Sequence, residues 1–345
     1  MKTRTMKNIL KTLAALSGGL IFSTAQVNAQ GAEPIPIKMC AFMFMGEGGP
    51  EHQALLDYKT AALEWGVKLE LKSYMHDKIA AEELKSGSCD IANMPSLQAR
   101  AFNKFTGTLD APASMPTYAH LRTVLQTLAK PSAAKYMRNG DFEVIGIQPA
   151  GAVFIFSNDN SIKGLSDLAG KKMAVLDTMP EMRQLVVDLG MTPVSSTLTN
   201  LFQKFNNKAI DITGGPAVVY EMMELEKGLR PDGGILAEPV MQGNSQFIAR
   251  WSKLPEGFTQ KSREYFMKNF DATLKFVREA EDNIPKELWI PLADDKREEY
   301  QQQTRSMRIA FRDKDIYDAK MLTLLRKVRC KKDATRAECT AADAE

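Results

Sequence analysis

The stretch that decides the fold lies at residues 35–50, Ile-Pro-Ile-Lys-Met-Cys-Ala-Phe-Met-Phe-Met-Gly-Glu-Gly-Gly-Pro. Its start is apolar and β-prone, and the glycines and proline at its end break the strand. An amphipathic helix is predicted over 51–65, and Gly66 ends it. A strand, a helix and a strand follow at 67–74, 78–85 and 89–94. This alternation predicts a parallel sheet with right-handed crossovers.

A second unit with the same order of elements is predicted further along the chain. Its strands are expected at 172–176, 194–196 and 209–213, and its helices at 180–189 and 200–206. Other predicted elements are strands at 142–147 and 152–157 and helices at 117–128, 258–281, 296–309 and 316–328. The repeated order predicts an α/β protein with two units rather than one large core.

The N-terminus has the order of a secretory signal peptide over residues 1–29. Four basic residues precede an apolar run at 13–22, and the small-residue exit Val27-Asn28-Ala29 follows. Cleavage after Ala29 would release the chain into the periplasm. An uncleaved anchor is the alternative, although the apolar run is shorter than the roughly 20 residues that span a bilayer.

Charge and motifs exclude several classes of function. Without the four basic residues of the signal peptide, 41 basic and 42 acidic residues remain, a formal net charge of −1. No basic surface for nucleic acid is implied. The sequence contains no G-x-S-x-G, no H-E-x-x-H and no P-loop, so we expect no enzyme. The three histidines are scattered, and we expect no metal and no cofactor.

The four cysteines favour disulfides, because their number is even and export is predicted. Cys330 and Cys339 lie close in sequence, so a local staple is the simplest pairing. That pairing leaves Cys40 with Cys89, on two predicted strands that would be neighbours in the sheet. Two buried free thiols at Cys40 and Cys89 are the alternative.

Four short segments follow one another in the second half of the chain. They are Leu165-Ser166-Asp167-Leu168-Ala169-Gly170-Lys171-Lys172-Met173, Asp188-Leu189-Gly190-Met191-Thr192-Pro193-Val194, Leu201-Phe202-Gln203-Lys204-Phe205 ahead of Ile210-Asp211, and Trp251-Ser252-Lys253-Leu254-Pro255. In this order and spacing they resemble segments of the solute-binding proteins of tripartite ATP-independent periplasmic (TRAP) transporters. The C-terminal helices and the cysteine-containing tail are similar to divergent members that are labelled as aminoglycoside-efflux components.

The resemblance implies a type II periplasmic-binding fold, with two α/β lobes around a cleft. Strands at 152–157 and 246–251 would cross between the lobes, and the long helix 258–281 would brace both. Lobe I would comprise 30–150 and about 247–285, and lobe II 151–246 and about 286–329. The polar C-terminal tail, 330–345, is expected to be loosely ordered.

The sequence departs from this family at the positions that usually hold the ligand. The resemblance places an arginine that clamps a substrate carboxylate where this chain has Ala174. A second arginine often follows the glycine at the first crossover, where Gly151 is followed by Ala152-Val153-Phe154. Both carboxylate clamps are therefore missing, and a neutral, amphipathic or cationic ligand is worth testing.

Ligands of open α/β sheets bind beyond the C-terminal ends of the strands, and four such ends are candidates here. The candidate ligand-binding residues are Phe44, Met45, Glu47 and Gly48; Pro95, Ser96 and Arg100; Asp177, Thr178 and Met179; and Thr213, Gly214, Gly215 and Tyr220. Each has a plainer interpretation. The first group could form an ordinary turn, Arg100 a solvated helix charge, Asp177 or Thr178 a helix N-cap, and Tyr220 a core residue.

The sequence thus predicts a periplasmic solute-binding protein, expected to be a monomer. It would capture a small organic ligand in an interlobe cleft and deliver it to integral-membrane transporter subunits. The alternatives are an accessory or sensor subunit of an efflux or transport system, and the binding protein of an ABC-type importer.

Overall fold

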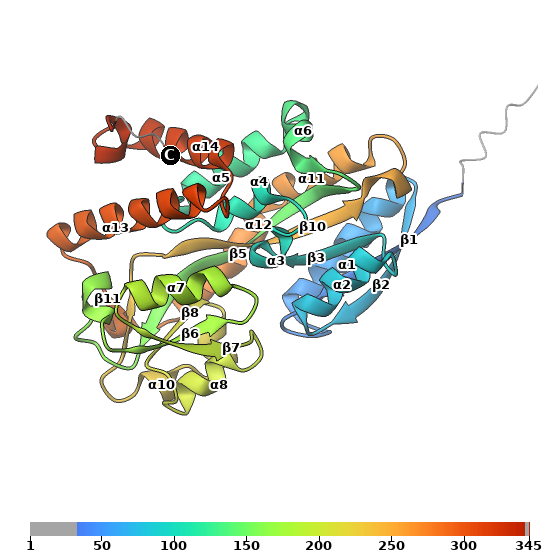
Figure 1. The fold of residues 1–345 in the computed structure, drawn as a ribbon. Coiled ribbons are helices and arrows are strands. Elements are labelled where there is room, and N and C mark those ends of the chain that lie inside the picture. The colour runs from blue at the N-terminus through green and yellow to red at the C-terminus, as the bar shows by residue number, and fades with distance from the viewer. Residues whose placement is uncertain (1–32, 342–344) are drawn as a thin grey trace, which may run out of the picture. The chain divides into compact units, whose positions relative to one another are not determined.

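The computed structural model describes residues 33–341 and 345, and at its centre lies one mixed β-sheet. The strand order is β2-β1-β3-β10-β5-β8-β6-β7, and helices lie on both sides of the sheet (Figure 1). The predicted signal peptide lies outside the described residues. Among the helices of the described part, none is both long enough and apolar enough to cross a membrane.

The first half of the sheet is the predicted parallel unit. Its elements are β1 (Ile35–Phe42), α1 (Pro50–Glu64), β2 (Val67–Tyr74), α2 (Asp77–Ser86) and β3 (Ile91–Pro95). β1 lies between the other two strands, and Met39 pairs with Leu71 on β2 and Ile91 on β3. β1 supplies Met39 and Ala41 to the core on one face and Cys40 to the core on the other, because successive side chains of a strand alternate.

The second half repeats this order. Its elements are β6 (Lys172–Leu176), α7 (Pro180–Asp188), β7 (Thr192–Ser196), α8 (Leu201–Asn206) and β8 (Ile212–Pro216). β6 pairs in parallel with β7 and with β8, so β6 occupies the place that β1 has in the first half. Two α/β units in one chain, as predicted, therefore share the sheet.

Two long antiparallel strands join the halves, β5 (Phe142–Ser157) and β10 (Met241–Arg250). β5 pairs with β10 along most of its length and with β8 at its end. The prediction of two separate strands at 142–147 and 152–157 was wrong. A bulge at Ala150 shifts the register opposite Gly243 and Asn244, which lets one strand pass through Pro149 and Gly151.

Helices α11 (Phe258–Lys268) and α12 (Phe270–Asp282) pack against β5. One continuous helix was predicted here, and the break at Asn269 is a correction. Asn269 leaves helical geometry, with φ −89° and ψ 4°, and its side-chain amide donates to the carbonyl of Tyr265 at 2.9 Å. Asparagine favours such breaks because its side chain competes with the backbone for hydrogen bonds.

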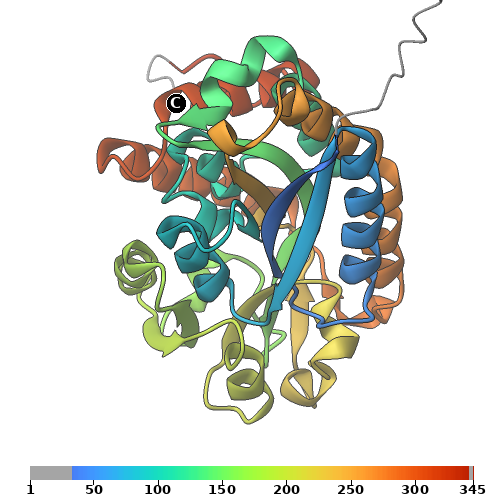
Figure 2. The same cartoon turned by 90° about the vertical axis from the view of Figure 1, so that its right-hand side faces the viewer.

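Different helices cover the two faces of the sheet. In the first half, α1 and α11 share one core, whereas α2, α5 (Tyr118–Leu128) and α14 (Ala319–Lys332) share the other (Figure 2). In the second half, α8 packs on one face, and α7 and α13 (Asp294–Asp313) on the other. The remaining short elements are α3 (Ser96–Ala99), α4 (Lys104–Gly107), α6 (Ala134–Met137), β4 (Arg138–Asn139), α9 (Val219–Met222), α10 (Glu226–Leu229), β9 (Gly234–Leu236) and β11 (Trp289–Ile290).

Both predicted disulfides are present. Cys40 on β1 is linked to Cys89, just ahead of β3, with the Cα atoms 5.9 Å apart. Cys330 on α14 is linked to Cys339 in the tail, with a Cα separation of 5.6 Å. Both separations lie in the usual range for a disulfide.

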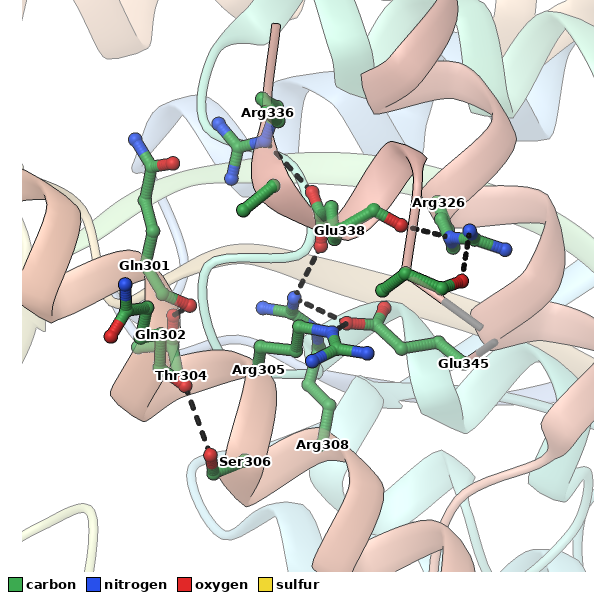
Figure 3. A network of polar contacts seen from close by, with 12 residues as sticks. Gln301, Gln302, Thr304, Arg305, Ser306, Arg308, Arg326, Arg336, Glu338 and Glu345 are labelled. Carbon is green, nitrogen blue, oxygen red and sulfur yellow. Dashed lines mark hydrogen bonds and ion pairs between the residues drawn. The ribbon is translucent and has the colours of Figure 1, made fainter. Parts of the chain in front are cut away.

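The C-terminal tail is not loosely ordered where the structure describes it, which corrects the expectation from its polar sequence. Arg308 on α13 and Arg329 on α14 are fully buried, and the carboxylates of Glu338 and Glu345 bind both guanidinium groups. Figure 3 shows Glu338 and Glu345 meeting Arg308. The polar composition of the tail did not predict its order, because each buried arginine needs a buried carboxylate. The tail supplies two such carboxylates, Glu338 and Glu345.

Candidate ligand-binding cavity

A cavity of about 630 Å³ lies where the two sheet halves and the crossover strands meet. Its wall includes the ends of β1, β3, β6 and β8, and pockets in open α/β sheets form at such ends. The lining residues include Phe42, Phe44, Met45, Glu51, Gln53, Asp57, Asn93, Pro95, Ser96, Met173, Ala174, Met179, Met182, Phe202, Thr213, Gly214, Gly215, Asn244, Asn269, Ala272, Thr273 and Phe276.

Most of the wall is apolar. Phe44, in the loop after β1, and Phe202, on α8, meet edge to face with their ring centroids 6.3 Å apart, which joins the two halves across the cavity. Methionines line the second-half side at Met173, Met179 and Met182. Their flexible thioether chains can repack around ligands of irregular shape. The cavity therefore suits a ligand with a substantial apolar body.

Two of the amides in the wall are engaged by the protein itself. Asn93 donates to the carbonyl of Phe42 at 2.9 Å and accepts from the amide of the same residue at 3.0 Å. Asn244 donates to the carbonyl of Gln242 and accepts from the side chain of Gln246. Both amides thus hold the crossover strands and β1 in place.

Thr213 is a cavity-lining residue on β8 with a fully buried side chain. Its Oγ1 has no hydrogen-bond partner in the part of the chain that the structure describes. A buried hydroxyl without a partner is costly.

Charge in the wall is of one sign. Glu51 and Asp57, both on α1, line the cavity, whereas no lysine, arginine or histidine does so among the described residues. Glu51 accepts a hydrogen bond from the backbone amide of Met45 at 3.3 Å. Burial raises the pKa of Glu51, against the lowering effect of backbone amides at Met45 and Phe44.

The structure brings together part of the predicted site. The predicted residues that line the cavity are Phe44, Met45, Pro95, Ser96, Met179, Thr213, Gly214 and Gly215. Glu47 and Gly48 lie in the same turn as Met45, but both are exposed and neither lines the cavity.

Arg100 is not at the cavity, so the prediction of an anion contact there was wrong. Its guanidinium binds the buried carboxylate of Asp110 through two contacts of 2.7 and 2.6 Å, and packs over the ring of Tyr317 at 5.0 Å. The side chain is only 12% exposed. Arg100 is therefore a structural residue rather than the solvated charge of the plainer interpretation.

The last group of candidates also lies away from the cavity wall. Asp177 and Thr178 are exposed, and neither caps α7, whose N-cap is Met179. Asp177 instead accepts a hydrogen bond from the hydroxyl of Ser195 on β7. Tyr220 is buried in the core under β8, as its plainer interpretation predicted.

The predicted strand ends gave no indication of the wall that α12 and the crossover strands supply. Asn269, Ala272, Thr273 and Phe276 form one side of the cavity from the start of α12. They follow one another at i, i+3, i+4 and i+7, which is one face of a helix. The mixed polarity of this helix face was the feature of the sequence from which these lining residues could have been predicted.

Comparisons with known proteins agree with this architecture. The family described as "Solute-binding protein AdeT 1/2" matches residues 54–344. The chain is 36% identical over 299 residues to the probable solute-binding protein AdeT1 of Acinetobacter baumannii, a match that covers 87% of this chain and 98% of AdeT1.

Solved structures of TRAP periplasmic solute-binding proteins share the fold. The protein from Desulfovibrio salexigens, with bound orotic acid, has a TM-score of 0.69 at 14% identity and covers 86% of this chain and 99% of its own. The protein from Haemophilus influenzae, with bound L-gulonate, has a TM-score of 0.68 at 17% identity and covers 85% and 98%. The predicted two-lobed periplasmic-binding fold is confirmed.

Proposed function

The chain belongs to the AdeT 1/2 family of solute-binding proteins, and on this premise we propose that it captures a small organic ligand in the cavity between its two halves. The observation that carries the proposal is the cavity itself, about 630 Å³ in volume and lined by both halves and the strands that join them. Volumes of this size hold drug-sized ligands.

The ligand would close the two halves around itself. The halves follow the proposed lobes, lobe I at 30–150 and about 247–285 and lobe II at 151–246 and about 286–329, except that α14 (Ala319–Lys332) packs in the core of the first half. The hinge would lie where Gly151 on β5 pairs with Gly243 on β10, beside the bulge at Ala150. Hinges are commonly formed by a few residues that absorb changes in backbone angles.

The protein would then deliver its ligand to integral-membrane transporter subunits. We place it in the periplasm as a monomer, where an oxidising environment sustains the disulfides Cys40–Cys89 and Cys330–Cys339. The wall is mainly apolar, and its charged side chains, Glu51 and Asp57, have no histidine, cysteine or lysine beside them among the described lining residues, which suits binding without chemical conversion.

Native mass spectrometry tests the proposal. The chain from Gln30 onward, unfolded and refolded with its disulfides intact to remove co-purified compounds, would be incubated with a small-molecule extract of bacterial cells. We expect a few compounds to remain bound, and the identified compound to raise the melting temperature by a few degrees at about 100 times its Kd.

A cavity-filling variant gives the matched control. Ala174→Trp places an indole in the cavity wall and is expected to abolish binding, whereas Ala119→Trp, at an exposed position on α5, leaves binding intact. If no compound binds the wild-type protein, solute capture is refuted. Co-purification with a membrane complex would then favour the accessory or sensor role.

A further inference from the structure

We propose that the cavity excludes carboxylates and takes a ligand with an apolar body and an uncharged or singly cationic head group, with Glu51 as the residue that sets this preference. The inference rests on the proposed function, because it concerns the ligand of the same cavity. It names the class of compound and the residue that selects it.

The charged side chains in the described wall are all negative. A carboxylate that enters the cavity leaves water and meets the carboxylates of Glu51 and Asp57, and no lysine, arginine or histidine of the described residues lines the cavity to pair with it. An ion without a partner loses its hydration and gains nothing in return. A neutral ligand avoids this penalty, and a cation gains an attraction.

The position of Glu51 also favours a positive head group. It lies in the first turn of α1, partly buried, and one carboxylate oxygen accepts from the amide of Met45. That bond fixes the carboxylate at the cavity wall, beside Phe44 and Met45, which are also lining residues. A positive head group could therefore bind Glu51 while its apolar body contacts the aromatic and methionine side chains.

The apolar side chains of the wall limit the number of charges on the ligand. Phe44, Phe202 and Phe276, together with the methionines of the second half, make most of the wall apolar. A polycation carries more charges than the two carboxylates of the wall, Glu51 and the exposed Asp57, can pair, and its other charges would lie against these apolar side chains. Compounds with several ammonium groups and no apolar body are therefore unsuitable.

Three probes with the same body and different head groups test the inference. Isothermal titration calorimetry at pH 7 would compare 4-phenylbutylamine, 4-phenylbutan-1-ol and 4-phenylbutyrate on the refolded chain from Gln30 onward. We expect the amine and the alcohol to bind, and the carboxylate to bind at least about tenfold more weakly than the alcohol, because nothing offsets the loss of its hydration.

The variant Glu51→Gln separates the role of the charge from the role of the turn. Glutamine keeps an acceptor for the amide of Met45 and removes the negative charge. We expect affinity for the amine to fall about tenfold, affinity for the alcohol to stay within about twofold, and the gap between alcohol and carboxylate to narrow. Gln53→Glu on the same helix is a matched control, since it adds charge at an exposed position of the wall, and it should strengthen amine binding.

The binding results distinguish failure of this inference from failure of the proposed function. The inference is overturned if 4-phenylbutyrate binds as tightly as the alcohol, if none of the probes binds, or if Glu51→Gln weakens amine and alcohol equally. A carboxylate recovered from the cell extract would also overturn it, yet would support solute capture. The absence of any bound compound in the extract would instead count against the proposed function.

Discussion

Arg308 and Arg329 are fully buried cations on neighbouring helices. The carboxylates of the C-terminal tail neutralise them, and these ion pairs hold the tail against the two helices. Glu338 binds both arginines, and it also pairs with Arg336. Burial alone would raise the pKa of Glu338. The hydrogen bonds and charge of Arg329, together with the charge of Arg308, outweigh burial and lower this pKa to about 2. The arginines in turn donate to the carbonyls of Pro112 and Ser114, so the network fixes the loop ahead of α5.

We expect Glu338→Gln to lower the free energy of unfolding by about 3–5 kcal/mol, because it leaves two buried guanidinium groups with one carboxylate fewer. Urea unfolding measured by circular dichroism gives this value. Glu279→Gln, which removes the partner of Lys275 in an exposed i,i+4 pair, is the control and should cost less than about 0.5 kcal/mol. A loss below about 1 kcal/mol for Glu338→Gln would show that the network contributes little.

His120 predicts a dependence of stability on pH. Burial, followed by the charges of Lys332, Arg336 and Arg329, lowers its pKa from 6.5 to about 4, and only Asp333 opposes them. Between these two values the unfolded chain binds a proton that the folded chain does not. The contribution of His120 to stability is therefore lost progressively as pH falls from about 7 to 4.

We expect His120→Gln to become more stable relative to wild type as pH falls from 7 to 5, when the free energy of unfolding is measured by urea denaturation at each pH. The comparison must be relative, because burial raises the pKa of Glu51 and Glu281, which acts in the opposite direction. His76→Gln, at an exposed position, should follow wild type. Parallel curves for His120→Gln and wild type would contradict the prediction.

The position of a single residue at the cavity could be predicted from sequence where it depends only on the end of a strand. Pro95 lines the cavity at the end of β3, and strand ends of this kind follow from sequence. Gly214 lines the cavity from within β8, because this strand continues to Pro216 instead of ending at residue 213 as predicted. Arg100 could not be placed in this way. Its position depends on Asp110, a partner that the sequence pattern does not single out, and a guanidinium that finds a buried carboxylate is no longer available to a ligand.

Among the elements, the two disulfides are expected to differ in their effect on stability. Cys40–Cys89 closes a loop of 49 residues and Cys330–Cys339 one of only 9. A longer loop removes more entropy from the unfolded chain, so through this entropy alone the loss of the first disulfide should cost about 4 kcal/mol and the loss of the second about 2.5 kcal/mol. Urea unfolding of the two double variants, Cys40→Ala/Cys89→Ala and Cys330→Ala/Cys339→Ala, measures the difference.

Reduction of the wild-type protein controls for the loss of buried sulfur. Cys89 lies in the apolar core with α2 and α5, so part of the cost of its replacement comes from packing. Wild-type protein under reducing conditions retains that packing and should lose about the entropic share alone. If the short tail loop proves the more stabilising of the two, the order expected from loop length is refuted.

Elements that depend on local periodicity were predictable, and those that depend on distant partners were not. The two strand–helix–strand–helix–strand units could be predicted from the spacing of apolar residues and from the glycines that end helices and strands. The single strand β5 does not, because Pro149 and Gly151 break any local pattern, and only pairing with β10 carries the strand through them. The cavity wall formed by α12 could not be predicted for the same reason. A helix face can be recognised as a cavity wall only when the residues opposite it are known.

For the whole molecule, the crossover of β5 and β10 is the feature on which closure would depend. Gly151 has a φ of +104°, where side chains are strained, and it pairs with Gly243 at the register shift. A Cβ atom at Gly151 would lie 3.1 Å from Cβ of Pro216 and 3.2 Å from Cγ1 of Val277. The two halves therefore approach each other closely around this residue, and a side chain would fit only if a neighbour moved by a few tenths of an ångström.

We expect Gly151→Ala to destabilise the protein by about 1–3 kcal/mol and to impair closure, because it adds both backbone strain and a contact between the halves. Small-angle X-ray scattering with the ligand identified from the extract would show the radius of gyration of wild type decreasing on binding, and decreasing less or not at all for Gly151→Ala. Gly140→Ala is the matched control, since Gly140 also has a positive φ, of +55°, but has open space around it. That variant should share the strain and still close. Equal closure of all three proteins would move the hinge away from this crossing and leave Gly151 a role in packing alone.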